Sequence, residues 1–313
     1  MGGLVVALSG GIGGAKLALG LSRVLPPEDL LVVANTGDDF EYLGLSISPD
    51  IDTVMYTLSG LANPELGWGR RDETWSFMET LATLGGETWF RLGDRDLAVH
   101  VERARRLRAG ESLTAITADL CARLGVACRV VPMSDDRVRT QVRTAEDGWI
   151  AFQDYFVRRQ CAPVVRELAF AGAASARPQP DFLAALRDPR LCAVVICPSN
   201  PFISIEPILA VPGVRAALLD CGAPVVAVSP IIGGRAIKGP TAKMMQEMQL
   251  DVSAASVAWR YGDLLDGYIV DHADADVPVN GPRVFATATL MSTLADRDAL
   301  ARAALDAAAA LRG

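Results

Sequence analysis

The stretch LVVALSGGIGGAKLALGLSRVL, residues 4–25, decides the fold class. It opens with a short apolar run, residues 4–9, which is typical of a buried strand, and four glycines follow within the next five positions. Apolar residues then recur at helical spacing, which predicts a helix packed on a sheet. LLVVAN, residues 30–35, predicts a second strand. This strand–helix–strand unit indicates parallel strands joined by a right-handed crossover.

The same alternation returns along the chain. Residues 53–125 are predicted to be mainly helical, and RVVP (129–132) predicts a strand that runs into a polar loop. CAVVIC (192–197) and APVVAVS (223–229) predict two further strands, and an alanine-rich helix is expected near 296–311. We therefore predict an α/β fold with a Rossmann-like, doubly wound, mainly parallel sheet.

One segment departs from this rhythm. VRTQVRTAEDGWIAFQDYF, residues 138–156, contains two period-two stretches around Glu146-Asp147-Gly148, which predicts a β-hairpin. We expect residues 135–180 to form a small inserted β-rich region. The Rossmann-like nucleotide-binding core is then built from residues 1–134 and 181–313.

Composition narrows the possible partners. The formal net charge of −7 argues against nucleic acid, whose phosphate backbone needs a basic surface. The longest uncharged stretch, 191–205, is too short and too broken by prolines to span a membrane. Six cysteines without a C-x-x-C pair are expected to be reduced thiols in a cytoplasmic protein. Only two histidines occur, so a histidine-rich zinc site is not expected.

Small polar residues follow four of the predicted strands. The loops are Ser9–Gly11, Asn35–Asp39, Pro198–Pro201 and Ser229–Ile231. In open α/β sheets ligands bind at the carboxyl ends of the strands, so these loops are expected to meet at one site.

The glycine cluster SGGIGGAKLA favours a phosphate group, because glycines allow close backbone approach and a helix N-terminus offers N–H donors. The spacing matches neither G-x-G-x-x-G nor G-x-x-x-x-G-K-[ST], which argues against an NAD-dependent oxidoreductase. The alternative is a tight turn without a ligand. Lys16 either reaches the anion or faces solvent.

Five acidic residues lie within fifteen positions after the second strand: Asp38, Asp39, Glu41, Asp50 and Asp52. Clustered carboxylates beside a phosphate site favour Mg²⁺. Helix capping and turn formation are the alternative explanation, particularly for Ser48-Pro49-Asp50.

Three further segments are candidate ligand contacts. GGETWFRLGDRDLA (85–98) can offer an aromatic wall and polar groups to a ring, or it can be a surface loop with ion pairs. PMSDD (132–136) is a polar break beside a strand. In SPIIGGRAIKGPTAK (229–243), Lys238 and Lys243 near Gly239-Pro240 can hold a diphosphate, or the segment is an ordinary loop.

Taken together and in this order, the segments resemble the 2-phospho-L-lactate transferases of deazaflavin coenzyme F(420) biosynthesis. The resemblance runs from Ser9 to about Thr293. Its landmarks are SGGIGGAKL, NTGDD, ISPDIDTVMYTL, WG at 68–69, RLGDRDLA, PMSDD, FQDYFVRR, PSNPFISI, and SPIIGG with KGP.

The resemblance implies a Rossmann-like homodimer and a Mg²⁺-dependent transfer. A phosphorylated three-carbon acid (2-phospholactyl, phosphoenolpyruvyl or phosphoglyceryl) would move from a guanosine diphosphate carrier to the ribityl hydroxyl of the deazaflavin Fo. GMP would be released. Which acid is transferred stays open.

The resemblance also implies roles for individual residues. Asp50 and Asp39 would be the metal ligands and catalytic carboxylates, without a distinction between base and ligand. The nucleotide would be held by Gly10, Gly11, Gly13, Gly14, Lys16, Ser199, Asn200, Pro201, Ser229, Gly239 and Lys243. The deazaflavin would contact Arg91, Asp94, Arg95, Met133, Ser134 and Asp135. Ile12 stands where the family often has Thr, which leaves only backbone contacts to phosphate there.

A related family of non-enzymatic regulators that bind nucleotide sugars shares the glycine loop and the NTGDD-like segment. Those proteins are not expected to carry RLGDRDLA together with PMSDD. This difference favours the transferase.

Overall fold

The computed structural model describes residues 2–237 and 239–312. Seven parallel strands form one sheet in the order β14-β13-β10-β9-β1-β2-β5. The strands are β1 (Leu4–Ser9), β2 (Leu30–Ala34), β5 (Arg129–Pro132), β9 (Leu191–Ile196), β10 (Val225–Val228), β13 (Gly267–Asp271) and β14 (Arg283–Thr287). The predicted α/β fold with a doubly wound parallel sheet is confirmed.

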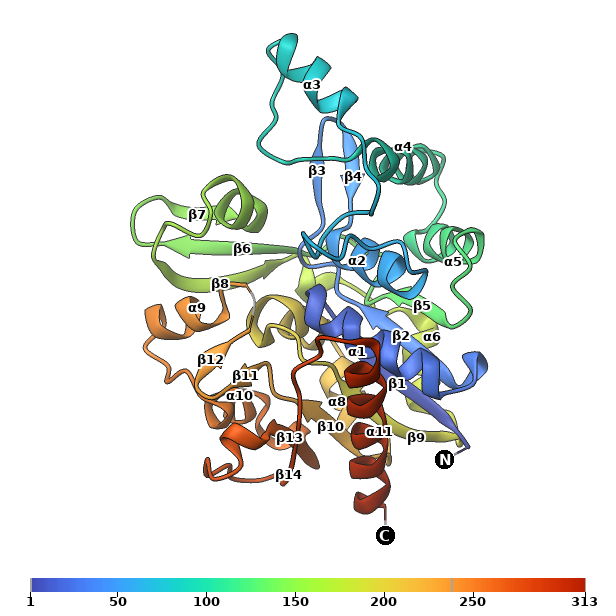
Figure 1. Cartoon of the computed structure of the whole chain (residues 1–313), viewed down its shortest axis with the longest axis vertical. Coiled ribbons are helices and arrows are strands. Elements are labelled where there is room, and N and C mark those ends of the chain that lie inside the picture. The colour runs from blue at the N-terminus through green and yellow to red at the C-terminus, as the bar shows by residue number, and fades with distance from the viewer. Residues whose placement is uncertain (1, 238, 313) are drawn as a thin grey trace.

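Helices cover both faces of this sheet (Figure 1). In β1, Val5 and Ala7 pack in the cluster that contains α1 (Gly11–Val24) and α11 (Leu294–Leu311). The alternate residues of the strand pack in the cluster that contains α6 (Pro180–Leu186) and α8 (Val214–Leu219). Because neighbouring side chains of a strand point to opposite faces, a strand buried on both faces is apolar throughout.

The predicted helices of residues 53–125 are present, separated by loops. They are α2 (Pro49–Leu58), α3 (Ser76–Thr83), α4 (Asp94–Arg108) and α5 (Leu113–Arg123). Shorter helices follow in the second half: α7 (Glu206–Leu209), α9 (Thr241–Glu247) and α10 (Ala254–Tyr261). No helix in the described ranges is long and apolar enough to cross a membrane.

Two small units stand beside the main sheet (Figure 1). One is an antiparallel sheet of β6 (Arg139–Thr144), β7 (Gly148–Ala151) and β8 (Val165–Ala171), in which β6 and β7 form the predicted hairpin. We call the other the arm. It contains the hairpin of β3 (Phe40–Tyr42) and β4 (Leu45–Ile47), α3 and the following segment 84–92, around a small apolar cluster of its own. The boundaries at 135 and 180 stay a prediction.

The sequence analysis did not predict β13 and β14. GYIVD begins with glycine, and RVFAT has only three apolar residues between polar ones. Both still join the sheet by parallel pairing, with Gly267 opposite both Val226 and Arg283. The strands matter for function because the loop after β14 reaches the site described next.

Candidate functional site

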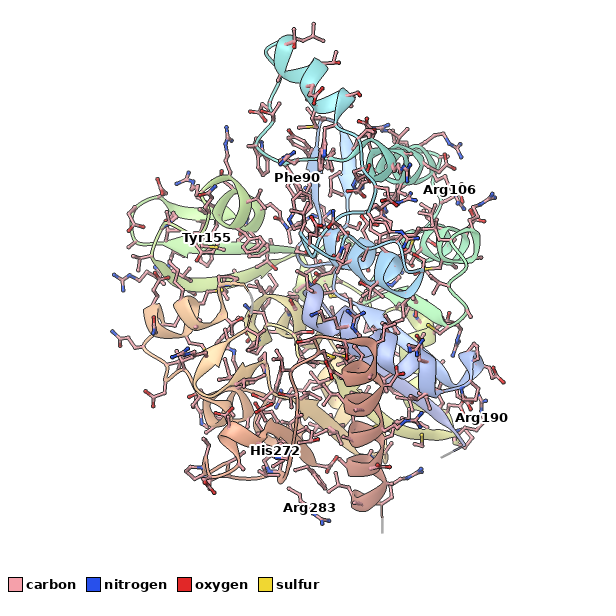
Figure 2. The ribbon with its side chains drawn as sticks, in the orientation of Figure 1. Phe90, Arg106, Tyr155, Arg190, His272 and Arg283 are labelled. Carbon is pink, nitrogen blue, oxygen red and sulfur yellow. The ribbon has the colours of Figure 1, made fainter. Side chains whose placement is uncertain are left out.

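A cavity of about 610 Å³ lies beyond the carboxyl ends of the central strands. Its wall is contributed by α1, α2, the arm, the region of β6 to β8, and the loops after β9, β10 and β14. Figure 2 labels Phe90 in the arm and Tyr155 in the region of β6 to β8, the two small units that border the cavity. Ten of the predicted site residues line it: Gly10, Gly11, Gly13, Lys16, Asp50, Arg91, Ser199, Asn200, Ser229 and Gly239.

The glycines allow three loops to approach one another closely. A Cβ on Gly10 would lie 2.6 Å from the Asp50 carboxylate, and one on Gly13 would collide with the Pro198 carbonyl oxygen. Gly14 is packed in the same way between Ser9 and Ser199 and lies behind the cavity wall. Since the N-cap residue Gly10 has no side chain, no cap side chain occupies the first turn of α1. The Gly11 N–H is taken by the Asp50 carboxylate, and the N–H groups that follow in the first turn are available to an anion.

Two buried carboxylates, Asp38 and Asp50, share this cavity. Asp50 lies in the first turn of α2, where its Oδ1 accepts from the Gly11 N–H at 2.6 Å. Its Oδ2 accepts from Asn35 Nδ2 at 2.9 Å. Asn35 Nδ2 also reaches Asp38 Oδ1 at 3.5 Å. The two acids are thus held by one amide and one helix N-terminus.

Burial dominates the electrostatics of this pair. It raises the pKa of Asp50 to about 6, although the hydrogen bonds from Asn35 and Gly11 oppose the change. Burial and then the charges of Asp50 and Asp39 raise the pKa of Asp38 well above its usual value. Carboxylates that are buried near one another favour a cation between them, because it offsets both desolvation and repulsion.

Asp39 lies elsewhere, on a smaller hollow of about 110 Å³ that Ser134 and Asp135 also line. Ser48 Oγ donates to Asp39 Oδ2 at 2.9 Å, and burial raises the pKa of Asp39 to about 7. Asp135 accepts from the Thr114 N–H at 2.7 Å and so caps α5. The structure therefore places some of the predicted site residues on a second, smaller hollow, and the larger cavity is lined by Asp38 and not by Asp39.

Asp94 and Arg95 of the predicted deazaflavin contacts lie outside the larger cavity. Asp94 accepts from Thr74 Oγ1 at 2.5 Å and from two N–H groups at the start of α3. Arg95 is exposed, and its own N–H donates to Glu73. Met133, a third predicted contact, is fully buried in the main core.

Two predicted nucleotide contacts are also away from the cavity wall. Pro201 begins the buried π-helical turn Pro201–Ile205. Lys243 Nζ donates to the Pro163 carbonyl oxygen at 3.0 Å and pairs with Glu247, so it joins α9 to the region of β6 to β8. Lys238 lies outside the described residues.

The cavity has a cationic and an aromatic part. Among the described residues of its wall, Lys16 and Arg91 are the basic ones. Lys16 Nζ donates to the Met291 carbonyl oxygen at 2.8 Å, and the Arg91 guanidinium lies 4.2 Å from the Trp75 ring centre. Aromatic side chains complete the wall: Trp89 and Phe90 of the arm, Phe152 and Phe156 of the region of β6 to β8, and Trp68 of the loop between α2 and α3.

A second buried acid cluster lies behind α2. Asp52 receives two hydrogen bonds from the guanidinium of Arg103, which is 1% exposed. His100 lies between Arg103 Nη1, at 3.2 Å, and Asp96 Oδ1, at 3.2 Å. Asp52, Asp96 and His100 are close enough to share a metal ion, but Arg103 already supplies the positive charge there. We therefore interpret this cluster as one that stabilises the fold, not as a metal site.

Sequence reasoning missed several wall residues. Asp38 was counted in the acidic cluster but not selected, because spacing cannot tell which of two adjacent aspartates faces a site. Phe152, Gln153 and Phe156 belong to FQDYFVRR, which was quoted as a landmark without a role. Thr289 to Met291 were missed with β14, since no strand was predicted before them.

The fold and this cavity define a class: an α/β protein with a glycine-rich helix start and two buried carboxylates at the carboxyl edge of a parallel sheet. Within that class, a family model described as 2-phospho-L-lactate transferase CofD matches residues 5–306. The chain belongs to this family of transferases of coenzyme F(420) biosynthesis, as the sequence motifs indicated.

Individual relatives agree with this assignment. The chain is 44% identical to the phosphoenolpyruvate transferase of Streptomyces griseus over 98% of this chain and 99% of that protein. It is 38% identical to the phosphoenolpyruvate transferase of Mycolicibacterium smegmatis over 97% and 98% of the two chains. A solved UPF0052 family protein from Bacillus halodurans has the same fold, with a TM-score of 0.64 over 97% of this chain and 99% of that one, at 15% identity.

Proposed function

We propose that the chain transfers a phosphoenolpyruvyl group from a guanosine diphosphate carrier to the terminal ribityl hydroxyl of Fo and releases GMP. The choice of acid rests on the relatives named phosphoenolpyruvate transferase, at 44% and 43% identity. The observation that carries the proposal is that two kinds of group line one cavity: the start of α1 with Lys16, which we call the anion-binding end, and five aromatic side chains, which we call the aromatic end. A diphosphate and a tricyclic ring are the two groups that this reaction has to bring together.

The anion-binding end suits the donor. The start of α1 and Lys16 offer positive potential to the diphosphate, and Ser199 and Asn200 border the same space. Guanosine is proposed over adenosine on the family resemblance. GDP should therefore raise the midpoint of thermal unfolding more than ADP at equal concentration, because ligands that bind the native state stabilise it. An equal or larger shift with ADP would reject the guanosine assignment.

Asp38 and Asp50 fit a divalent cation. Both are buried, both face the cavity, and Asp50 is held by neutral donors, which leaves its negative charge for a ligand. Hard carboxylate oxygens are the ligands that Mg²⁺ prefers, and when bound it would neutralise charge on the diphosphate. This assignment replaces Asp39 by Asp38 in the predicted ligand pair.

The remaining chemistry is positioning. The Fo hydroxyl attacks the phosphorus that carries the acid, the bond from that phosphorus to the bridging oxygen breaks, and the oxygen leaves on GMP. Among the described wall residues, Asp38 and Asp50 are the acceptors for the hydroxyl proton. Catalysis then comes from alignment and charge neutralisation.

The aromatic end suits the deazaflavin. Phe152 and Phe156 stack with their ring centres 5.3 Å apart, and Trp89 and Phe90 lie in the arm that borders the same cavity. Fluorescence titration with Fo tests this end of the site. Phe156→Ala should weaken Fo binding about tenfold, the size of one lost aromatic contact. Trp149→Ala is the control, because Trp149 is an exposed aromatic of β7 outside the cavity wall.

The decisive experiment is mass spectrometry of the product formed from Fo, Mg²⁺ and each guanylated acid in turn. The expected result is a phosphoenolpyruvyl ester of Fo together with GMP. A larger yield with the lactyl or glyceryl donor would change the acid and keep the reaction. The absence of turnover with all three donors, together with tight binding of a nucleotide sugar, would favour the regulator instead.

We also propose a homodimer, from the family resemblance. Light scattering of the purified chain tests it by mass.

A further inference from the structure

Asn35 occupies the point where the loops of the site converge. It follows β2, is fully buried, and its N–H donates to the Ser9 carbonyl oxygen at 3.0 Å. This bond continues the ladder between β1 and β2 by one residue, so the backbone of Asn35 is fixed to the centre of the sheet.

The carboxamide of Asn35 is engaged at both ends. Its Oδ1 accepts from the Gly37 N–H at 2.8 Å, which fixes the orientation of the amide and turns Nδ2 toward the acids. Nδ2 donates to Asp50 at 2.9 Å and to the Ile203 carbonyl oxygen at 3.1 Å, and it reaches Asp38 at 3.5 Å. One side chain therefore ties α2, the turn after β9 and the loop after β2 together.

The neutrality of the Asn35 carboxamide matters as much as its position. An amide is neutral, so it orients the carboxylates without cancelling their charge, whereas the guanidinium of Arg103 neutralises Asp52 two residues along. Partners that orient metal ligands typically act in this way, and their loss lowers metal affinity about 10- to 100-fold.

We infer that Asn35 is a positioning residue, whose carboxamide holds Asp38 and Asp50 in the arrangement that binds the divalent cation. The inference rests on the metal role of these acids in the proposed function. It concerns binding by the protein alone, so it is tested without Fo or a guanylated donor.

The test is a titration of the purified chain with Mn²⁺ alone, followed by electron paramagnetic resonance. Asn35→Ala removes both N–H donors and should weaken Mn²⁺ binding at least about tenfold. Asn35→Ser is the second variant if the alanine variant does not fold, because its hydroxyl oxygen is an acceptor for the Gly37 N–H that Asn35 Oδ1 now binds.

Gln179→Ala is the matched control. Gln179 is another buried carboxamide, but it caps α6 by accepting from the Phe182 N–H at 2.8 Å and lines neither hollow. Its loss should lower the unfolding midpoint and leave Mn²⁺ binding unchanged. Mn²⁺ affinity within twofold of the parent in a folded Asn35 variant would overturn the inference. Failure to act on Fo with normal Mn²⁺ binding by the parent would count against the proposed function alone.

Discussion

Asp50 and Asp52 lie two residues apart in the first turn of α2, both at least nine-tenths buried, yet they have opposite surroundings. Asp50 faces the cavity and accepts hydrogen bonds from a backbone N–H and an amide. Asp52 faces α4 and is paired with the guanidinium of Arg103. One helix turn thus carries a carboxylate whose charge is balanced inside the protein and one whose charge is not.

The titration of the neighbouring groups follows this difference. Burial raises the pKa of Asp50 to about 6, because neutral donors compensate only part of the lost hydration. On the other face, burial by itself would lower the pKa of Arg103, but the charge and hydrogen bonds of Asp52 outweigh it and raise the pKa. In a buried ion pair the protein itself neutralises the carboxylate. A buried carboxylate that has only neutral donors keeps its charge and can bind a metal cation.

The strongest test of the comparison is Arg103→Met. This change leaves Asp52 buried without its cation, and breaking such a pair typically costs about 3–5 kcal/mol of the free energy of unfolding. Urea unfolding measures the loss. Arg105→Met is the control on the same helix, because its pair with Glu102 is exposed on both sides and should matter little. Equal urea midpoints for the two variants would mean that the Asp52 face is not a structural ion pair.

Asp50→Asn tests the other face. Turnover should fall at least about 100-fold, the scale of losing one element that stabilises charge in the transition state. The fold should persist, because the buried charge removed is one that the protein does not neutralise by itself. Asp52→Asn should show the reverse, a large loss of stability that leaves Arg103 unpaired. Full activity of the parent enzyme in EDTA would show that the reaction does not need a divalent cation.

The fold class could be predicted from the sequence, because the strands β1, β2, β9 and β10 are buried on both faces and so appear as uninterrupted apolar runs. The strands β13 and β14, one beginning with glycine and the other with only three consecutive apolar residues, are recognised only through pairing with a neighbour, which no local pattern encodes. The same limit applies to the site. Motif order identified the glycine turn and the acidic segment, but the side on which Asp38, Asp39 and Asp52 lie is set by the loop and helix geometry around them.

The pH dependence of the free energy of unfolding should also distinguish the Asp52 side of α2 from the Asp50 side. Burial alone would raise the pKa of Asp96, but His100, Tyr56 and Arg103 outweigh it and hold the pKa below its usual value. A carboxylate of this kind contributes stability above its unfolded pKa, about 3.9, and loses it as the pH falls below that value. Asp96→Asn should therefore be less stable than the parent by about 1–3 kcal/mol at pH 6.

The gap between the parent and Asp96→Asn should begin to close as the pH falls below about 4, because the unfolded parent then takes up a proton at Asp96. It should be closed once the folded carboxylate, whose pKa is lower, is protonated as well. Urea midpoints across this range measure it. A gap that stays constant down to pH 3 would show that Asp96 contributes packing rather than charge.

The smallest expected effect concerns the two histidines, which transfer enzymes often use as base or nucleophile because their pKa lies near neutrality. Here His100 belongs to the paired face behind α2, and exposed His272 is outside the cavity wall. If alignment and charge neutralisation carry the reaction, the double variant His100→Asn and His272→Asn should keep turnover within about tenfold of the parent, less than the usual loss of a general base. Its stability should fall, because His100 links Arg103 to Asp96, so turnover has to be measured well below its unfolding midpoint. A larger fall in a folded variant that still binds Fo would mean that a histidine takes part in the reaction. If that histidine is His100, the side of α2 that carries Asp52 would be catalytic as well as structural.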